Sequence, residues 1–242
     1  MGPVTDIAPP LIDMIAVRKV YQAVEPLRIK RLTVNGTDRV VLCGLDPAAA
    51  ELLIHMIMGA VLPDEGQVRV AGRDTRDIAT DTEWLTSLDQ FGIVTDRAVF
   101  LEGLSIAANV ALPMTVAIDP LSAETRRRVD ALAAEVGLPN ARLDAPASSL
   151  EPDERVRVHL ARALAVDPVM LLLEHPTMRV DDRTASQAVG RTLRAIADAR
   201  ELGWVAVTDD DVFTEASGGR RLWLDRGAWR PDTVWRRLWR RR

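Results

Sequence analysis

The chain has 242 residues, of which 48% are hydrophobic and 27% charged, and its formal net charge is −4. This composition is typical of a soluble globular protein and excludes disordered and collagen-like chains. A single cysteine excludes an internal disulfide, and we expect neither a secretory signal nor a membrane-spanning helix. Residues 220–242 carry +7 and residues 1–219 carry −11, so we expect no general nucleic-acid binder but a local contact at the basic C-terminus.

The hydrophobic pattern predicts strands that alternate with helices, as in a layered α/β fold. Strands are expected at residues 12–20, 27–34, 39–43, 67–71, 169–173, 204–208 and 221–224. Helices are expected at residues 48–59, 122–136, 154–165 and 184–199, and residues 96–165 are mostly helical. The apolar run at 169–173 is typical of a central parallel strand that is covered on both faces.

Several short segments occur in a defined order and spacing along the chain. A strand that ends in Gly44 is followed by a helix and by the run PDEGQVRVAG at 63–72. The later segments are NVALP at 109–113, ARALA at 161–165, LLLEHPT at 171–177 and VAVTDD at 205–210. Together these segments resemble the landmarks of the ATP-binding cassette (ABC) family over about residues 12–230. The resemblance implies an α/β fold of the P-loop NTPase type, with a mixed central sheet, an antiparallel β subdomain and an inserted helical subdomain.

The resemblance also implies how the chain is divided. One ABC-type domain would span residues 1–242, with an α/β core at 12–95 and 166–230 and a helical subdomain at about 96–165. The last residues, 231–242, would form a basic amphipathic tail. In this tail Trp235, Leu238 and Trp239 lie on one stripe beside arginines, which suits a membrane surface or a partner's groove, or packing on the chain's own domain.

The segment after the strand 39–43 departs from a working phosphate-binding loop. Such a loop needs several glycines, a lysine for the terminal phosphates and a Ser/Thr hydroxyl for magnesium. Here residues 44–51 read GLDPAAAE, so Gly44 is the one glycine left, and Pro47 removes an N–H donor. By the resemblance, Ala50 takes the lysine position and Glu51 the first Ser/Thr position. We therefore expect that this loop does not hold ATP in the usual way.

The resemblance places six carboxylates at positions that face a nucleotide in the family. They are those of Asp46, Glu51, Asp96, Glu151, Asp153 and Asp209. Asp96 replaces the glutamine that senses magnesium, and Asp209 replaces the switch histidine. Because two unit charges about 4 Å apart interact by about 4 kcal/mol at an effective dielectric constant near 20, this set predicts the loss of ATP affinity.

Other positions keep part of the family's chemistry. Glu174 and His175 occupy Walker B positions, where Glu174 could ligate a metal and His175 could act as a general base, although we favour a locally hydrogen-bonded histidine. Tyr21 lies where the family stacks an aromatic ring on adenine, or else packs its ring on the core. Asp181 takes the place of the aspartate in the family's dimer-interface loop. We predict no catalytic residue and no metal site with these motifs, and ATP and Mg are cofactors only if nucleotide binding survives.

Three functions are compatible with this sequence. The first is a pseudo-ATPase cassette subunit of a membrane transporter, with a structural or regulatory role. The second is a working ATP-binding subunit that energises an ABC transporter. The third is a non-transport cassette protein that acts as an interaction module. The resemblance implies a membrane permease and a second cassette, identical or different, as partners, no nucleic acid, and a place in the cytoplasm at the inner face of the membrane.

Overall fold

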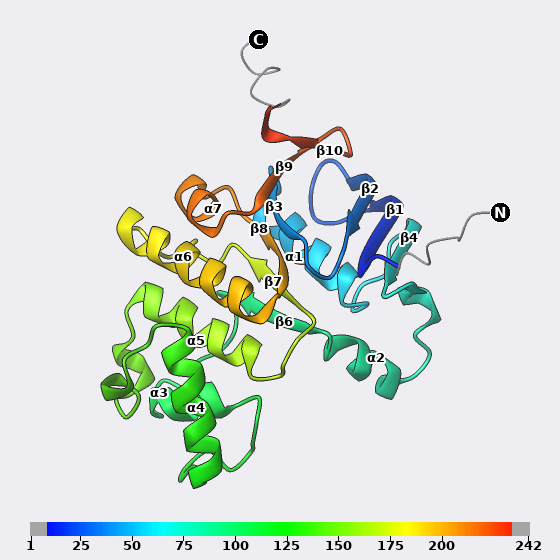
Figure 1. Ribbon diagram of the computed structural model, residues 1–242. Helices are drawn as coiled ribbons and strands as arrows, with labels where there is room; N and C mark the ends of the chain where they lie inside the picture. The colour runs from blue at the N-terminus through cyan, green and yellow to red at the C-terminus, as the bar shows by residue number, and fades with distance from the viewer. Residues whose placement is uncertain (1–8, 234–242) are drawn as a thin grey trace, which may run out of the picture.

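The computed structural model describes residues 9–233, and within this range one 10-stranded sheet runs through the molecule (Figure 1). The strands are β1 (Ile12–Lys19), β2 (Leu27–Val34), β3 (Arg39–Cys43), β4 (Glu65–Val70), β5 (Arg73–Asp74), β6 (Phe91–Thr95), β7 (Met170–Glu174), β8 (Gly203–Val207), β9 (Arg220–Asp225) and β10 (Ala228–Pro231). Their order across the sheet is β5-β4-β1-β2-β10-β9-β3-β8-β7-β6. The sheet is mixed: β9, β3, β8, β7 and β6 pair in parallel, whereas β5, β4, β1 and β2 pair in antiparallel fashion.

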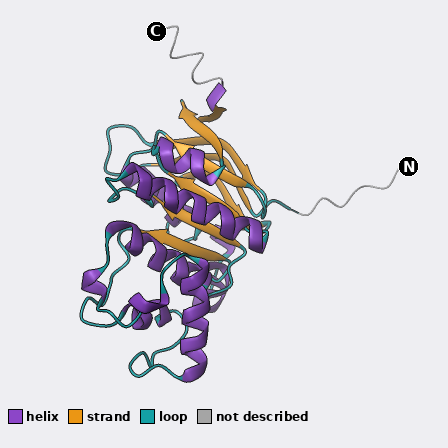
Figure 2. Ribbon diagram, turned by 60° about the vertical axis from the view of Figure 1, so that its left-hand side comes forward, coloured by secondary structure: helices purple, strands orange, loops and turns teal. Residues whose placement is uncertain are grey.

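The helices cover both faces of the parallel strands (Figure 2). They are α1 (Pro47–Ile57), α2 (Asp81–Leu88), α3 (Ile106–Ala111), α4 (Ala123–Glu135), α5 (Pro152–Leu164), α6 (Arg183–Arg200) and α7 (Asp211–Ser217). Helix α1 covers one face together with β1, β2 and β4, and α6 and α7 cover the other. Helices α3, α4 and α5 gather at one end of the molecule, below α6 in Figure 1.

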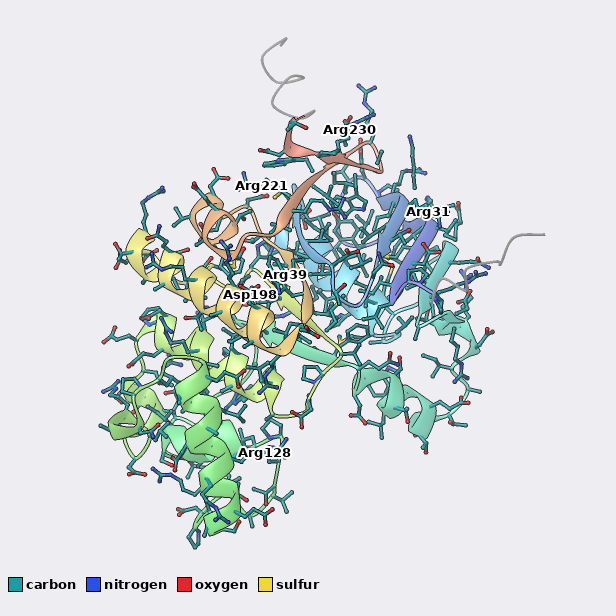
Figure 3. All side chains as sticks on the ribbon, viewed as in Figure 1. Arg31, Arg39, Arg128, Asp198, Arg221 and Arg230 are labelled. Carbon is teal, nitrogen blue, oxygen red and sulfur yellow. The ribbon has the colours of Figure 1, made fainter. Side chains whose placement is uncertain are left out.

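The alternation of side chains along β3 explains why both faces are buried. Val40 and Leu42 point into the apolar cluster under α1, whereas Val41 and Cys43 point into the cluster under α6. Every residue of β7 is buried, as the apolar run at 169–173 predicts. On the α6 face an ion pair between Arg39 and Asp198 joins β3 to α6 (Figure 3). Within residues 9–233 no helix has the length and apolar character that a membrane span requires.

The cassette fold expected from the resemblance is confirmed, but five strands and helices were not predicted. These are α2, β5, β6, α7 and β10. Helix α2 has no buried residue and therefore no apolar stripe that a pattern search could find. Strand β10 has no buried residue and is held by antiparallel pairing with β9 across a two-residue turn.

Candidate functional site

The N-terminus of α1 is occupied by a carboxylate of the chain itself. Asp46 is the N-cap residue, and its Oδ1 accepts a hydrogen bond from the Ala49 N–H at 2.8 Å. Its Oδ2 accepts a hydrogen bond from the Tyr21 hydroxyl at 3.0 Å. A helix N-terminus attracts anions through its free N–H groups and its dipole. Asp46 therefore fills the place where this helix would otherwise hold a phosphate.

A second carboxylate is bound to the loop that precedes α1. The Gly44 N–H donates to Asp209 Oδ1 at 2.9 Å. Gly44 has φ +81°, a left-handed conformation that explains why a glycine is kept at this position. Two backbone donors of the loop, those of Gly44 and Ala49, are thus already satisfied within the chain.

An arginine supplies the positive charge that the lysine position lacks. Ala50 is fully buried in the cluster under α1, so it brings no charge to the loop. Arg97, the second residue after β6, lies with Nη2 2.5 Å from Glu174 Oε2, and its Nη1 contacts Glu51. The Glu174 side chain is only 6% exposed, whereas that of Arg97 is 39% exposed. Arg97 therefore bridges the end of β7 and the first half of α1.

The surroundings of Glu174 decide its protonation. Burial raises the pKa of the Glu174 carboxyl above its usual value, and the nearby Arg97 guanidinium opposes this rise. The carboxylates of Glu51 and Asp96 act in the same direction as burial. Within residues 9–233 no group of three or more Asp, Glu, His and Cys side chains is placed to hold a metal ion.

His175 is a strained residue at the carboxyl end of β7. Its φ is +41°, which is uncommon for a residue other than glycine. Its N–H donates to the Val207 carbonyl at 2.8 Å, and its Nε2 is buried without a hydrogen-bond partner in the described part of the chain. Burial lowers the pKa of His175, against the opposing effect of Asp209 and other carboxylates. The described hydrogen bond of His175 is therefore made by its main chain, and the role of its side chain stays a prediction.

Five of the six predicted carboxylates contact a partner within the chain. Asp46, Glu51 and Asp209 have the partners given above, Asp96 contacts Arg179 at 2.9 Å and Asp153 contacts Arg157 at 3.4 Å. The remaining one, Glu151, is exposed at the start of α5, where its N–H donates to Glu154 at 3.0 Å. Competition from these internal contacts therefore adds to the charge repulsion that the sequence predicts.

Two neighbouring cavities mark the cleft. The loop cavity, about 410 Å³, is lined by residues 44–47, His175 and residues 208–210, among others. The hairpin cavity, about 390 Å³, shares residues 44–46 with it and is also lined by Tyr21, Arg28 and Arg226.

The structure places the predicted site residues unequally. Tyr21 and Gly44 line the hairpin cavity, and Asp209 lines the loop cavity. Tyr21 follows β1, half-buried, and its ring also packs on the cluster under α1. Ala50 is part of the core, and Asp181 is exposed in the loop before α6, outside the described lining of both cavities.

Sequence reasoning missed three arginines of this site: Arg97, Arg28 and Arg226. The carboxylates themselves were the signal for Arg97, because a buried carboxylate such as Glu174 needs a cation or donor nearby. Nothing in the sequence pattern indicated the other two, since they meet only when the β9–β10 turn packs on β2.

The residues present do not fit ATP and magnesium. The loop donors of Gly44 and Ala49 are satisfied, and the carboxylate of Glu51 contacts Arg97. The two lysines are elsewhere, with Lys19 bound to Asp64 and Lys30 on β2.

A third cavity, about 450 Å³, lies between the end of β6 and α5, and we call it the β6–α5 cavity. Its lining includes Val99, Phe100 and His159. The Phe100 ring lies 4.6 Å from that of His159, and the guanidinium groups of Arg155 and Arg162 lie 5.0 and 4.8 Å from the Phe100 centroid. Burial and the two arginines lower the pKa of His159 to about 4, so this ring packs as a neutral group.

Comparisons with known proteins agree with the fold. The family model described as "ABC transporter" matches residues 27–178. The lipoprotein-releasing system ATP-binding protein LolD of Pseudomonas syringae pv. tomato is 28% identical over 197 residues, which cover 78% of this chain and 86% of that protein. The methionine import ATP-binding protein MetN 2 of Paraburkholderia xenovorans is 33% identical over 168 residues.

Some relatives are longer than this chain. The match covers 69% of this chain but 42% of MetN 2. It covers 75% of this chain but 28% of the macrolide export ATP-binding/permease protein MacB 1 of Aeromonas hydrophila, at 30% identity. Among solved structures, a nucleotide-free ATP-binding cassette from an ABC transporter superimposes with a TM-score of 0.76 at 14% identity, covering 96% of this chain and 95% of that one. A dimeric bacterial ABC transporter cassette superimposes with a TM-score of 0.73 at 23% identity, covering 90% of this chain and 96% of that one.

Proposed function

The chain belongs to the ABC transporter family, and on this premise we propose that it is a cassette subunit with little or no ATP hydrolysis and a structural or regulatory role in a membrane transporter. The observation that carries the proposal is the internal occupation of the phosphate site. Asp46 caps α1, Asp209 holds the Gly44 N–H, and Arg97 contacts Glu51 and Glu174. A nucleotide would have to break these contacts and place its phosphates beside the carboxylates that make them.

Calorimetric titration of the full chain with Mg-ATP, together with phosphate release, tests this proposal. We expect no magnesium-dependent binding and no turnover. Any trace of phosphate release should be equal in the wild-type chain and in a His175→Ala variant, because it would come from a contaminating enzyme. Micromolar binding with turnover that His175→Ala abolishes would overturn the proposal and favour the working ATPase.

We further propose that the chain docks on a permease through the β6–α5 cavity and acts at the cytoplasmic face of the membrane. The names of LolD and MetN 2 describe ATP-binding proteins of lipoprotein release and methionine import, which supports a transport setting. The cavity offers apolar surface, since Val99 in its lining is 75% exposed. A second cassette is the other proposed partner, because related cassettes are dimeric.

A matched pair of variants tests the permease contact. Val99→Asp places a charge in the cavity, whereas Val116→Asp changes a fully exposed valine outside its described lining. We expect the first variant to lose co-purification with membranes and the second to keep it. Equal behaviour of the two variants would contradict docking through this cavity. The predicted division into an α/β core, a helical subdomain and a tail remains part of this proposal, and Trp235, Leu238 and Trp239 lie outside the described residues.

The third function, an interaction module for a cation or a basic peptide, has less support from the site. That hypothesis rested on an acidic cleft. Asp46, Asp96 and Asp209 each accept a hydrogen bond within the chain, so a basic ligand would have to compete with these contacts.

A further inference from the structure

The hairpin cavity contains two arginines that the fold does not use. Arg28 on β2 and Arg226 in the turn between β9 and β10 both line it and are exposed. Neither side chain makes an ion pair or a hydrogen bond within residues 9–233. Around them, Arg31 contacts Asp13 and Arg230 contacts Asp225, so neighbouring arginines on the same strands are neutralised.

Arg226 is held in a conformation that does not suit an arginine. Asp225 pairs with Ala228, so Arg226 and Gly227 form a two-residue turn, with φ +48° and +79°. Turns of this kind need positive φ at both central residues and favour Asn, Asp or Gly there. A side chain with a Cβ is strained in this region, and within residues 9–233 Arg226 gains no hydrogen bond or ion pair in return. A strained residue without a structural partner is a reason to look for a function.

The turn is fixed directly against β2. The Lys30 N–H donates to the Gly227 carbonyl at 2.6 Å. A Cβ added to Gly227 would lie 3.3 Å from Arg28 Cβ, so the turn backbone touches Arg28. Figure 3 shows Arg31 and Arg230 at the same end of the molecule, on the strands that bring Arg28 and Arg226 together. The two free guanidinium groups therefore start from backbone segments that are in contact.

Three other donors near the hairpin cavity are already engaged. The N–H groups of Gly44 and Ala49 and the Tyr21 hydroxyl all bind carboxylates of the chain. One carboxylate without a described partner, that of Glu25, also lines the hairpin cavity. An anion that enters this cavity finds two guanidinium groups without a described partner at the turn and on β2.

We propose that the hairpin cavity binds a small organic ligand through a phosphate or similar oxyanion held by Arg28 and Arg226. Guanidinium groups form paired, charge-assisted hydrogen bonds with phosphate oxygens. A volume of about 390 Å³ suits a small molecule, and Leu27 and Leu224 provide apolar lining for its body. The proposal goes beyond the proposed function, because it requires no ATP binding and assigns the oxyanion to Arg28 and Arg226 rather than to the N-terminus of α1.

The test uses the full chain and two soluble probes, pyrophosphate and ribose 5-phosphate, without magnesium and at constant ionic strength. Binding is measured by calorimetry for the wild-type chain, Arg28→Gln and Arg226→Gly. The control is Arg127→Gln, which removes the same charge from an exposed arginine on α4 that lies outside the described lining of the cavity. We expect saturable binding that either cavity variant weakens by about tenfold and the control by less than about twofold. Arg226→Gly should also raise the Tm, because glycine relieves the strain, and this excludes misfolding as the cause of weaker binding.

No saturable binding by the wild-type chain, or equal weakening by Arg127→Gln, would overturn the proposal. A second arm measures sedimentation with vesicles that contain about 30% anionic phospholipid. If Arg28 and Arg226 are needed for vesicle binding while neither soluble phosphate binds, the source is a lipid headgroup and the small-ligand proposal is wrong. Binding of a soluble phosphate that needs both arginines supports it, whatever the vesicles do. Turnover of Mg-ATP would refute the proposed function and would leave this result unchanged.

Discussion

Removing the guanidinium of Arg97 is the sharpest perturbation of the site. In an Arg97→Met variant the apolar stem is kept while the charge that bridges α1 and β7 is lost. Glu174 then remains in place with its side chain 6% exposed and no cation beside it. Glu51, at 43% exposure, regains water more easily, so Glu174 dominates the expected effect.

The size of the effect follows from these exposures. Breaking a fully buried ion pair by removing one partner costs about 3–5 kcal/mol. Arg97 is 39% exposed, so water already screens part of the pair, and we expect about 2 kcal/mol at neutral pH. For a chain of this size that corresponds to a fall in Tm of roughly 4–8 °C.

The loss should depend on pH in a defined direction. The pKa of Glu174 is raised by burial, and Arg97 is the largest opposing influence, so the pKa rises further in the variant. A carboxyl with a raised pKa in the folded state destabilises the fold as pH rises through that value, because it must then ionise while buried. The stability difference between Arg97→Met and the wild-type chain should therefore be larger at about pH 8 than at about pH 5.

Thermal and urea unfolding of both chains at the two pH values measure this difference. The matched control is Arg127→Met, an exposed arginine on α4 without a described ion pair, which should change stability by less than about 0.5 kcal/mol. The double variant Arg97→Met with Glu174→Gln should recover most of the loss, since no buried charge remains. An Arg97→Met chain as stable as the wild type, or equally destabilised at both pH values, would refute the reasoning.

Three further predictions concern other parts of the molecule. Ala50→Lys should lower stability by about 2 kcal/mol or more, because Ala50 is fully buried, and should not restore Mg-ATP binding in calorimetry. Asp46→Ala should cost about 1 kcal/mol as a lost N-cap, measured by urea unfolding. It should also bring the pKa of Tyr21, which burial and then Asp46 raise, closer to its usual value in an ultraviolet titration; an unchanged titration would contradict the hydrogen bond. The third concerns His159, whose pKa of about 4 lies below its unfolded value, so stability should fall between about pH 6.5 and pH 4 as the unfolded chain takes up the proton; a His159→Leu variant should flatten that profile.

Much of the fold could be predicted because its parallel strands are marked by continuous apolar runs. β3 and β7 are buried along their length, and their patterns are visible without a structure. By contrast, α2 has no buried side chain, and β10 depends on its pairing with β9, so neither leaves a clear pattern in the sequence.

The sequence indicated which residues take the family's nucleotide-site positions, but not which contacts those residues make. The missing lysine at Ala50 and the carboxylates at Asp46 and Asp209 follow from their order in the chain. That Arg97 bridges two carboxylates, or that Arg28 meets Arg226, depends on contacts between residues far apart in sequence. Such contacts arise from the packing of α1, β6 and β7, or of a turn on β2. The hydrophobic periodicity of the sequence does not predict them.

The internal contacts of the loop also bear on how this chain could change over time. A lysine introduced beside Glu51 would lie near the Arg97 guanidinium, and a variant that lacks Arg97 would leave the buried Glu174 without a cation. Removing the Asp46 side chain would leave the Ala49 N–H at the start of α1 without its hydrogen-bond acceptor unless an anion took that place. Each of these single substitutions is therefore expected to lower the stability of the fold. Only substitutions that change both partners of a contact avoid this loss. The internal contacts of the loop thus disfavour single substitutions of the side chains that make them.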